Sequence, residues 1–352
     1  MRRGVVLFIL VNVLILGFLI RSVFTLLTLL LEDASTDAIH RSEIPELDSS
    51  MLDSRPQIIP KIIHQTYIND SIPEHWLGPQ QSCINLHPDY EYKLWTDVKS
   101  REFIAEEYPW FLETFDGYKY PIQRADSIRY FVLAHYGGIY IDLDDGCHRR
   151  LDPLLSYPAW VRRTKPTGIS NDAMGSVPQH PFFLRVMASL QAYDRHWFLP
   201  YITVMYSTGP LFLSVIWKEY MRDSFGMDRV RVLMPDEYNG FPWSFFTHHV
   251  GNSWHRGDAQ LIFWMSSHWL LLTVMGFILA GCIGFCMWLV YGRLLLLGQY
   301  RHRYVRVGNS SSSSTKMRRR PFVIMPSFLR RISASSNSSD EELGHKEEIY
   351  SE

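Results

Sequence analysis

Residues 136–146 combine the end of a helix, a buried strand and an acidic cluster: Tyr136-Gly137-Gly138-Ile139-Tyr140-Ile141-Asp142-Leu143-Asp144-Asp145-Gly146. The glycine pair ends a helical pattern, and the three apolar residues that follow predict a short buried strand. Asp142 and Asp144 are two residues apart, so on an extended backbone their side chains point to the same side. Two converging carboxylates suit a hard divalent cation, which can in turn hold a diphosphate. An acidic turn without a ligand is the alternative, because Asp-x-Asp alone is a weak signal.

The segments around this motif alternate between strands and helices. Two strands and two helices are expected, at residues 58–66, 90–95, 100–108 and 121–136. The last helix has a proline in its first turn and a glycine after its end, as helices commonly do. This order predicts an α/β domain whose ligand site lies at the carboxyl ends of its strands.

The overall charge of the chain limits its partners. The 352 residues carry a formal net charge of −1, whereas nucleic-acid-binding proteins normally have a strongly basic surface. We therefore expect no nucleic-acid partner. The length suits one large domain or two smaller ones.

Two apolar runs predict a membrane protein. The first extends over residues 4–20 and resumes over residues 23–31, and the second covers residues 269–292 without any Asp, Glu, Lys or Arg. The second run is long enough to span a bilayer. A cleaved signal peptide is the alternative for the first run, which is long for one and lacks a clear small-residue cleavage site. We expect a retained membrane anchor over residues 1–31 and a transmembrane helix within residues 268–297.

Charged flanks predict the topology of the chain. Arginines lie before the first run and after the second, at Arg2, Arg3, Arg293, Arg301, Arg303 and Arg306. Since positive residues favour the cytosolic side, both ends should be cytosolic and the region between the spans lumenal. The sequon that begins at Asn69 is then accessible for glycosylation.

The same topology sets the domain boundaries. Residues 32–56 are polar and are expected to form a stem, residues 57–267 a folded lumenal domain, and residues 298–352 a disordered cytosolic tail. Cys83 and Cys147 are lumenal in this arrangement and could pair there, although the sequence does not decide whether they do.

Two further clusters carry groups that can bind a ligand. Asp126 and Arg129 share one face of the expected helix 121–136 and could hold ribose, sugar hydroxyls or phosphate. A surface ion pair is the alternative. A second cluster, of polar and aromatic residues, precedes the second apolar run: His248, His249, Asn252, Ser253 and Trp254. Imidazole and amide groups can complete a metal shell, but histidines beside a membrane are also common as structural residues.

Four motifs in order resemble a known family. They occupy residues 59–66, 125–130, 137–144 and 248–254. The region 58–265 resembles the fungal glycosyltransferases that carry the DXD sugar-binding motif, which include the initiating α-1,6-mannosyltransferase and the mannosyltransferases of sphingolipid synthesis. The second apolar run and the Asp-Leu-Asp-Asp-Gly-Cys continuation are most similar to the sphingolipid subgroup. The resemblance implies a single Rossmann-like domain of the GT-A type, flanked by two transmembrane helices.

The resemblance also implies residue roles. Asp142 and Asp144 match the metal motif, and His248 and Asn252 are the candidates for the remaining ligands. Asp126 and Arg129 match positions that hold the donor sugar and the ribose-phosphate region, so they join Asp142 and Asp144 as candidate catalytic residues. The nucleotide-sugar is expected to contact further residues, namely His64, Gln65, Thr66, Ser253 and Trp254.

The implied reaction is metal-dependent transfer of mannose, with retention of configuration, from GDP-mannose to inositol phosphorylceramide. The metal would be Mn²⁺ or Mg²⁺. The enzyme would reside in the Golgi membrane or in the endoplasmic reticulum. A membrane-bound regulatory subunit is an expected partner. The first alternative is an α-mannosyltransferase for protein-linked glycans. A phosphatase with an Asp-x-Asp nucleophile and a non-catalytic complex subunit are the others.

Overall fold

The computed structural model describes residues 2–32, 34–45, 55–164, 167–224, 226–235, 241–249 and 257–308. The chain divides into two units, Met1–Trp269 and Leu270–Glu352. The candidate residues Asn252, Ser253 and Trp254 lie outside the described residues, as does the predicted tail from residue 309 onward.

A seven-stranded mixed sheet forms the centre of the first unit, in the order β1-β8-β6-β7-β4-β2-β3. Its strands are β1 (Ala38–Ile39), β2 (Ile62–Thr66), β3 (Glu91–Trp95), β4 (Gly138–Ile141), β6 (Ala159–Arg163), β7 (Ile169–Ser176) and β8 (Arg231–Leu233). The strand β7 is antiparallel to both of its neighbours, β4 and β6, and the remaining pairs are parallel. A separate antiparallel pair joins β5 (Asp145–Cys147) to β9 (Phe246–His248). The predicted α/β class is confirmed.

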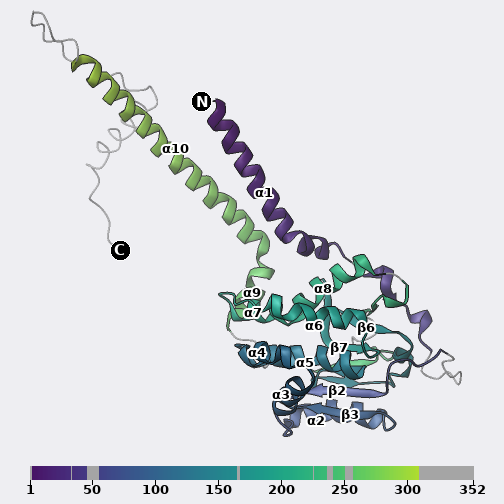
Figure 1. Ribbon diagram of the computed structural model, residues 1–352. Helices are drawn as coiled ribbons and strands as arrows, with labels where there is room; N and C mark the ends of the chain where they lie inside the picture. The colour runs from purple at the N-terminus through teal and green to yellow at the C-terminus, as the bar shows by residue number, and fades with distance from the viewer. Residues whose placement is uncertain are drawn as a thin grey trace, which may run out of the picture. The chain divides into compact units, whose positions relative to one another are not determined.

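Helices surround this sheet, as Figure 1 shows. The described helices of the first unit are α1 (Arg2–Leu30), α2 (Glu74–Leu86), α3 (Asp97–Glu107), α4 (Pro109–Gly117), α5 (Pro121–Tyr136), α6 (Pro181–Tyr193), α7 (Pro200–Ser207), α8 (Pro210–Asp223) and α9 (Gly257–Ser267), of which α1 does not cover the sheet. Among the described residues, short 3-10 turns occupy Ser35–Asp37, Arg41–Glu43, Asp152–Ser156 and Gly226–Asp228. The helix α10 (Trp269–Gly308) belongs to the second unit except for its first residue, Trp269, which is the last residue of the first unit.

Both faces of the sheet are buried, and alternate strand residues enter two separate hydrophobic clusters. Tyr140 packs with residues of α3 to α6 and α8 on one face. Its neighbours Ile139 and Ile141 pack on the other face with residues of α2, β9 and the turn after β5. Because successive side chains of a strand point to opposite faces, β4 needs apolar residues at every position. This double burial places the end of β4 in the middle of the domain.

The helix α5 has the bounds that its sequence predicts. Pro121 occupies its first turn, and the side chain of Gln123 accepts a hydrogen bond of 3.0 Å from the backbone N–H of Tyr120. The helix ends at Gly137, whose φ of +67° favours glycine. A Cβ atom there would lie 2.6 Å from Cδ of Pro178. Gly137 therefore permits both the sharp exit from the helix and the close approach of the following loop.

Three other expected elements are present with shifted bounds. The strand expected over residues 58–66 begins at Ile62, and the one expected over 90–95 begins at Glu91. The helix expected over 100–108 is α3, which starts earlier because the hydroxyl of Thr96 caps it by accepting from the backbone N–H of Lys99 at 3.3 Å.

Part of the expected stem belongs to the sheet. The strand β1 pairs in parallel with β8, and Asp37 forms a two-bond ion pair with Arg229 at 2.7 and 2.6 Å. Ile39 and Ile44 are buried.

Cys83 and Cys147 form a disulfide that joins α2 to β5, so the pairing that the sequence left open is made in the structure.

One described helical segment, Trp269–Tyr291, is long and apolar enough to cross a membrane. The helix α1 meets that criterion only if Leu10–Arg21 and Phe24–Leu30, which bend by 54° at their junction, count as one span. The structure thus supports one candidate span, and the expected second span at residues 1–31 stays a prediction.

Candidate active site

The acidic motif forms a turn directly after β4. The backbone N–H of Asp142 donates to the carbonyl of Asp172 at 2.7 Å, and the backbone N–H of Asp145 donates to the carbonyl of Asp142 at 3.0 Å. The extended backbone that the two-residue spacing suggested for Asp142 and Asp144 is therefore wrong, because the strand ends at Ile141. The turn nevertheless brings both carboxylates to the wall of one cavity.

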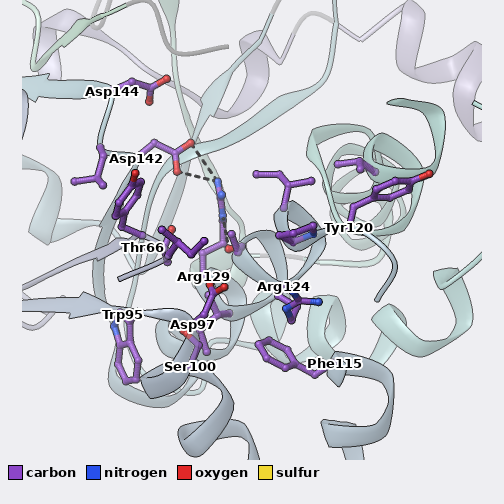
Figure 2. A pocket seen from close by; sticks show the side chains of 18 of the residues that line it. Thr66, Trp95, Asp97, Ser100, Phe115, Tyr120, Arg124, Arg129, Asp142 and Asp144 are labelled. Atoms are coloured by element: carbon purple, nitrogen blue, oxygen red, sulfur yellow. Dashed lines mark hydrogen bonds and ion pairs between the residues drawn. The ribbon is translucent and has the colours of Figure 1, made fainter. Parts of the chain in front are cut away.

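This cavity has a volume of about 530 Å³ and lies beyond the carboxyl ends of β2, β3 and β4 (Figure 2). Three of its walls differ in chemistry. Asp142, Asp144 and Arg129 make a charged wall. Aromatic residues make a second wall, namely Tyr67, Trp76, Trp95, Phe115 and Tyr120, and α7 and α9 contribute Pro200, Tyr201, Val204 and Asp258 to a third. A site with an acidic end and flat aromatic surfaces suits a polar ligand that also has ring-shaped parts.

Asp142 is held from two sides. The hydroxyl of Tyr140 donates to Asp142 Oδ1 at 2.6 Å, and the hydroxyl of Thr66 lies 2.8 Å from that of Tyr140. Arg129 Nη1 lies 3.2 Å from Asp142 Oδ1 and 3.3 Å from Oδ2. Burial raises the pKa of Asp142 to about 7, although Arg129 acts in the opposite direction. These contacts fix the carboxylate and leave it poorly suited to act as the free nucleophile that a phosphatase would need.

Asp126 and Arg129 form a buried pair, so the alternative of a surface ion pair is excluded. Their side chains are 6% and 4% exposed, and Arg129 Nη2 lies 3.1 Å from Asp126 Oδ1. Asn171 donates to Asp126 Oδ1 at 2.9 Å, and Thr208 donates to Asp126 Oδ2 at 3.1 Å. Arg129 Nη1 also donates to the carbonyl of Asn171 at 2.6 Å. Asp126 does not line the cavity in this structure, and its contacts suit a residue that positions Arg129.

Burial and neighbouring charges shift the pKa of both members of this pair upward. Burial raises the pKa of Asp126, and Arg129 and the two hydrogen bonds counteract this only in part. Burial alone would lower the pKa of Arg129, but the charges of Asp142 and Asp126 raise it instead. Arg129 is therefore a permanent positive charge between two carboxylates.

The motif at residues 64–66 supplies one residue to the cavity, Thr66. His64 is fully buried, lies 2.8 Å from the carbonyl of Gly137 through Nε2 and accepts from the indole of Trp95 through Nδ1 at 3.0 Å. Burial lowers its pKa to about 4, so it is neutral. Gln65 is also buried and accepts from the hydroxyl of Tyr92 at 2.8 Å. Of these three expected nucleotide contacts, Thr66 lines the cavity, whereas His64 and Gln65 do not.

His248 lies beside the acidic turn. In the β5–β9 pair it is opposite Asp145, and its Nδ1 lies 2.9 Å from Asp145 Oδ1. This hydrogen bond raises the pKa of His248. Asp145 is fully buried and also forms an ion pair with Arg162. A carboxylate on one ring nitrogen leaves Nε2 as the nitrogen that can bind a metal, which is a common arrangement of metal-bound histidines.

The charges around the turn favour a cation. Four carboxylates face two guanidinium groups here: Asp142, Asp144, Asp145 and Asp172 against Arg129 and Arg162. Burial, together with the neighbouring Asp145, raises the pKa of Asp144 to about 6. Within the described ranges, no set of three or more His, Cys, Asp or Glu side chains is arranged to hold a metal. Asp142 and Asp144 offer carboxylate oxygens, the donors that Mn²⁺ and Mg²⁺ prefer, and would supply part of the shell of such an ion.

Sequence reasoning missed several residues of the site. Asn171 and Asp172 are brought to Arg129 and Asp142 by the pairing of β7 with β4, and no local pattern marks them, whereas Tyr140 lies in the segment 136–146 itself, two residues before Asp142. Thr208 does have a signal, since it lies in a Ser-Thr-Gly-Pro sequence between α7 and α8. The aromatic wall has none, because aromatic residues are frequent throughout the chain.

Comparisons with known proteins agree with the resemblance noted in the sequence. The profile of the family described as "Glycosyltransferase sugar-binding region containing DXD motif" matches residues 73–160. The mannosyl phosphorylinositol ceramide synthase SUR1 of Saccharomyces cerevisiae is 47% identical over 348 residues, which cover 97% of this chain and 87% of that protein. Its paralogue CSH1 is 52% identical over 302 residues, covering 83% of this chain and 80% of that protein.

A relative from another yeast gives the same result. The inositol phosphoceramide mannosyltransferase 2 of Schizosaccharomyces pombe is 51% identical over 265 residues, which cover 74% of this chain and 75% of that protein. The chain therefore belongs to the family of fungal inositol phosphoceramide mannosyltransferases and is a glycosyltransferase.

Proposed function

We propose that this chain transfers mannose from GDP-mannose to the inositol of inositol phosphorylceramide, with retention of configuration, and so makes mannosylinositol phosphorylceramide. The observation that carries the proposal is the convergence of Asp142, Asp144 and Arg129 on one cavity at the end of β4. The names of the relatives support the choice of acceptor. The domain is proposed to be of the GT-A type.

Asp142 and Asp144 are the proposed metal ligands, and His248 and Asn252 the proposed completion of the shell. Bound Mn²⁺ or Mg²⁺ would supply positive charge to the departing diphosphate. Arg129 is proposed to hold the phosphate end of the donor, because its guanidinium is fixed by Asp126 and by the carbonyl of Asn171. Pre-organised positive charge of this kind needs little rearrangement when the sugar bond breaks.

The aromatic wall is proposed to hold the base and the sugar ring of the donor. Trp76 and Tyr67 contact each other edge to face with ring centres 5.7 Å apart, and both line the cavity. Ring-shaped ligand parts pack well on such surfaces. Thr66 is proposed to contact the nucleotide beside them, and Ser253 and Trp254 are proposed as further contacts of the nucleotide-sugar.

The cellular setting is part of the proposal. Two membrane spans, a lumenal domain and residence in the Golgi membrane follow from the charge flanks and the family resemblance. A membrane-bound regulatory subunit is a proposed partner.

A transfer assay tests this function. Purified full-length chain is incubated with labelled GDP-mannose and either inositol phosphorylceramide or an α-mannoside glycan, with Mn²⁺ or with a chelator. The expected result is label in the lipid only, lost on chelation and lost in the Asp144→Ala variant. Label in the glycan alone, or transfer that survives both chelation and Asp144→Ala, would contradict the proposal.

A further inference from the structure

The helix α9 is unsuited to contact with water. Four of its large apolar side chains are each nearly half exposed, namely Leu261, Phe263, Trp264 and Met265. After Asp258 no Asp, Glu, Lys or Arg occurs until Arg293. A helix that is apolar on most sides is normally buried in protein or in lipid.

A second apolar feature is the loop before α7. Phe198 is 99% exposed and Trp197 is 50% exposed. The loop is nonetheless held in place, because the backbone N–H of Trp197 donates to the hydroxyl of Thr203 at 2.9 Å and the Trp197 ring lies 5.7 Å from that of Tyr206. A fixed loop that presents a fully exposed phenylalanine is a feature of binding surfaces.

The loop and α9 are connected through the start of α7. The carboxylate of Asp258 accepts a hydrogen bond of 2.6 Å from the backbone N–H of Tyr201, and the rings of Tyr201 and Phe263 are 5.6 Å apart. Tyr201 and Asp258 also line the cavity that contains Asp142 and Asp144. The same contacts therefore join the apolar surface to one wall of the candidate active site.

We infer that Trp197, Phe198 and the exposed side chains of α9, here called the interfacial patch, insert into the bilayer surface and hold the α7–α9 wall of the cavity at the level of the lipid head groups. The inference rests on the proposed function insofar as the acceptor is a membrane lipid. Lipid would then reach the cavity along this wall without leaving the membrane.

The position of the patch in the chain favours lipid as its occupant. Only His268 separates the end of α9 at Ser267 from the candidate span that begins at Trp269. The C-terminal end of α9 therefore lies at the membrane surface whenever that span is inserted. Tryptophan and other aromatic residues are enriched at this depth of a bilayer, and an apolar helix lying in the interface gains from burying its side chains there.

Fluorescence of the full-length chain in nanodiscs tests the placement. In a Cys282→Ser, Cys286→Ser background, Phe198→Cys carries an environment-sensitive dye. The matched control is Ile58→Cys. Ile58 is also an exposed apolar residue, but it lies before the start of β2, whereas the cavity lies beyond the end of β2. We expect a blue shift and quenching by spin-labelled lipid at position 198 and neither at position 58. Equal exposure of both sites to water, or protection of position 198 only when a second protein is added, would overturn the inference.

Kinetics of Phe198→Asp test the consequence for the acceptor. The KM for inositol phosphorylceramide in vesicles should rise roughly tenfold or more, since the substitution removes the insertion of a large apolar side chain. The KM for GDP-mannose and the rate with a water-soluble inositol phosphate acceptor should stay unchanged. An unchanged KM for the vesicle acceptor would overturn the inference. If the unsubstituted chain transferred mannose to no inositol acceptor, the proposed function would fail, while the fluorescence result would still decide the membrane contact.

Discussion

At the scale of single residues, the acidic turn combines charges that do not balance within the protein. Asp142 is buried beside Arg129, and Asp144 lies near Asp145, whose charge acts on it more strongly than the opposing charge of His248. Desolvation and mutual repulsion raise the pKa of both Asp142 and Asp144. Such a site gains free energy from a ligand that carries positive charge.

Metal affinity should therefore depend on pH. The pKa values of about 7 for Asp142 and about 6 for Asp144 mean that protons compete with the metal near neutral pH. A carboxyl must lose its proton to bind a cation, so affinity should rise from pH 5.5 to pH 7.5, by roughly tenfold per unit for each proton released. Calorimetric titration with Mn²⁺ measures this dependence. An affinity that stays constant over this range would contradict it.

Two aspartates of the site should differ in their effect on stability. Asp126→Ala leaves Arg129 with one buried partner fewer, which should cost about 3–5 kcal/mol in the free energy of unfolding. Asp144→Ala should cost little in the metal-free protein, because the environment already disfavours the Asp144 charge. Denaturation of the two variants in detergent measures the difference. Equal losses of stability would show that the assignment of positioning and ligating roles is wrong.

The sequence predicted which residues line the cavity better than it predicted which residues are buried beside it. Asp142, Asp144, Arg129 and Thr66, all of them candidates from the motifs, line the cavity, and their roles toward metal and donor stay predictions. His64 and Gln65 belong to the same motif but bond to the backbone and to neighbouring side chains instead. A local pattern does not tell a polar residue that contacts ligand from one that is buried, because burial is decided by strands and helices far away in the chain.

At the scale of elements, the helix α5 was predictable because proline and glycine mark its two ends. The strand β1 was not, because two residues are too few to show an alternating pattern. It pairs with the distant strand β8, and the ion pair next to it joins Asp37 to Arg229, which are 192 positions apart. The β5–β9 pair likewise depends on a contact between distant segments.

The disulfide between Cys83 and Cys147 should stabilise the element that follows the acidic turn. It closes a loop of 64 residues and attaches β5 to α2. Replacing both cysteines by serine should lower the free energy of unfolding by about 2–4 kcal/mol. The control is the double variant Cys282→Ser, Cys286→Ser. It replaces two exposed free cysteines by the same residue and removes no disulfide. The two double variants should differ in thermal denaturation, and identical curves would refute the prediction.

At the scale of the whole molecule, the proposed topology makes one of three sequons accessible. The Asn69 sequon is in the proposed lumenal domain, where Asn69 is exposed, whereas the Asn309 and Asn337 sequons follow the second apolar run. In yeast, endoglycosidase should therefore remove a glycan from the unsubstituted chain and from Asn309→Gln with Asn337→Gln, but not from Asn69→Gln. A glycan on Asn309 or Asn337 would place that end of the chain in the lumen instead.

The most direct test of the central claim is binding of GDP-mannose to the full-length chain, measured by calorimetry with and without Mn²⁺. The claim is that Asp142, Asp144 and Arg129 form a metal-dependent donor site in one cavity. We predict binding that requires Mn²⁺ and that is lost in Asp144→Ala while the folded domain is retained. Equal affinity of the unsubstituted chain and Asp144→Ala, or binding that is indifferent to Mn²⁺, would contradict the claim.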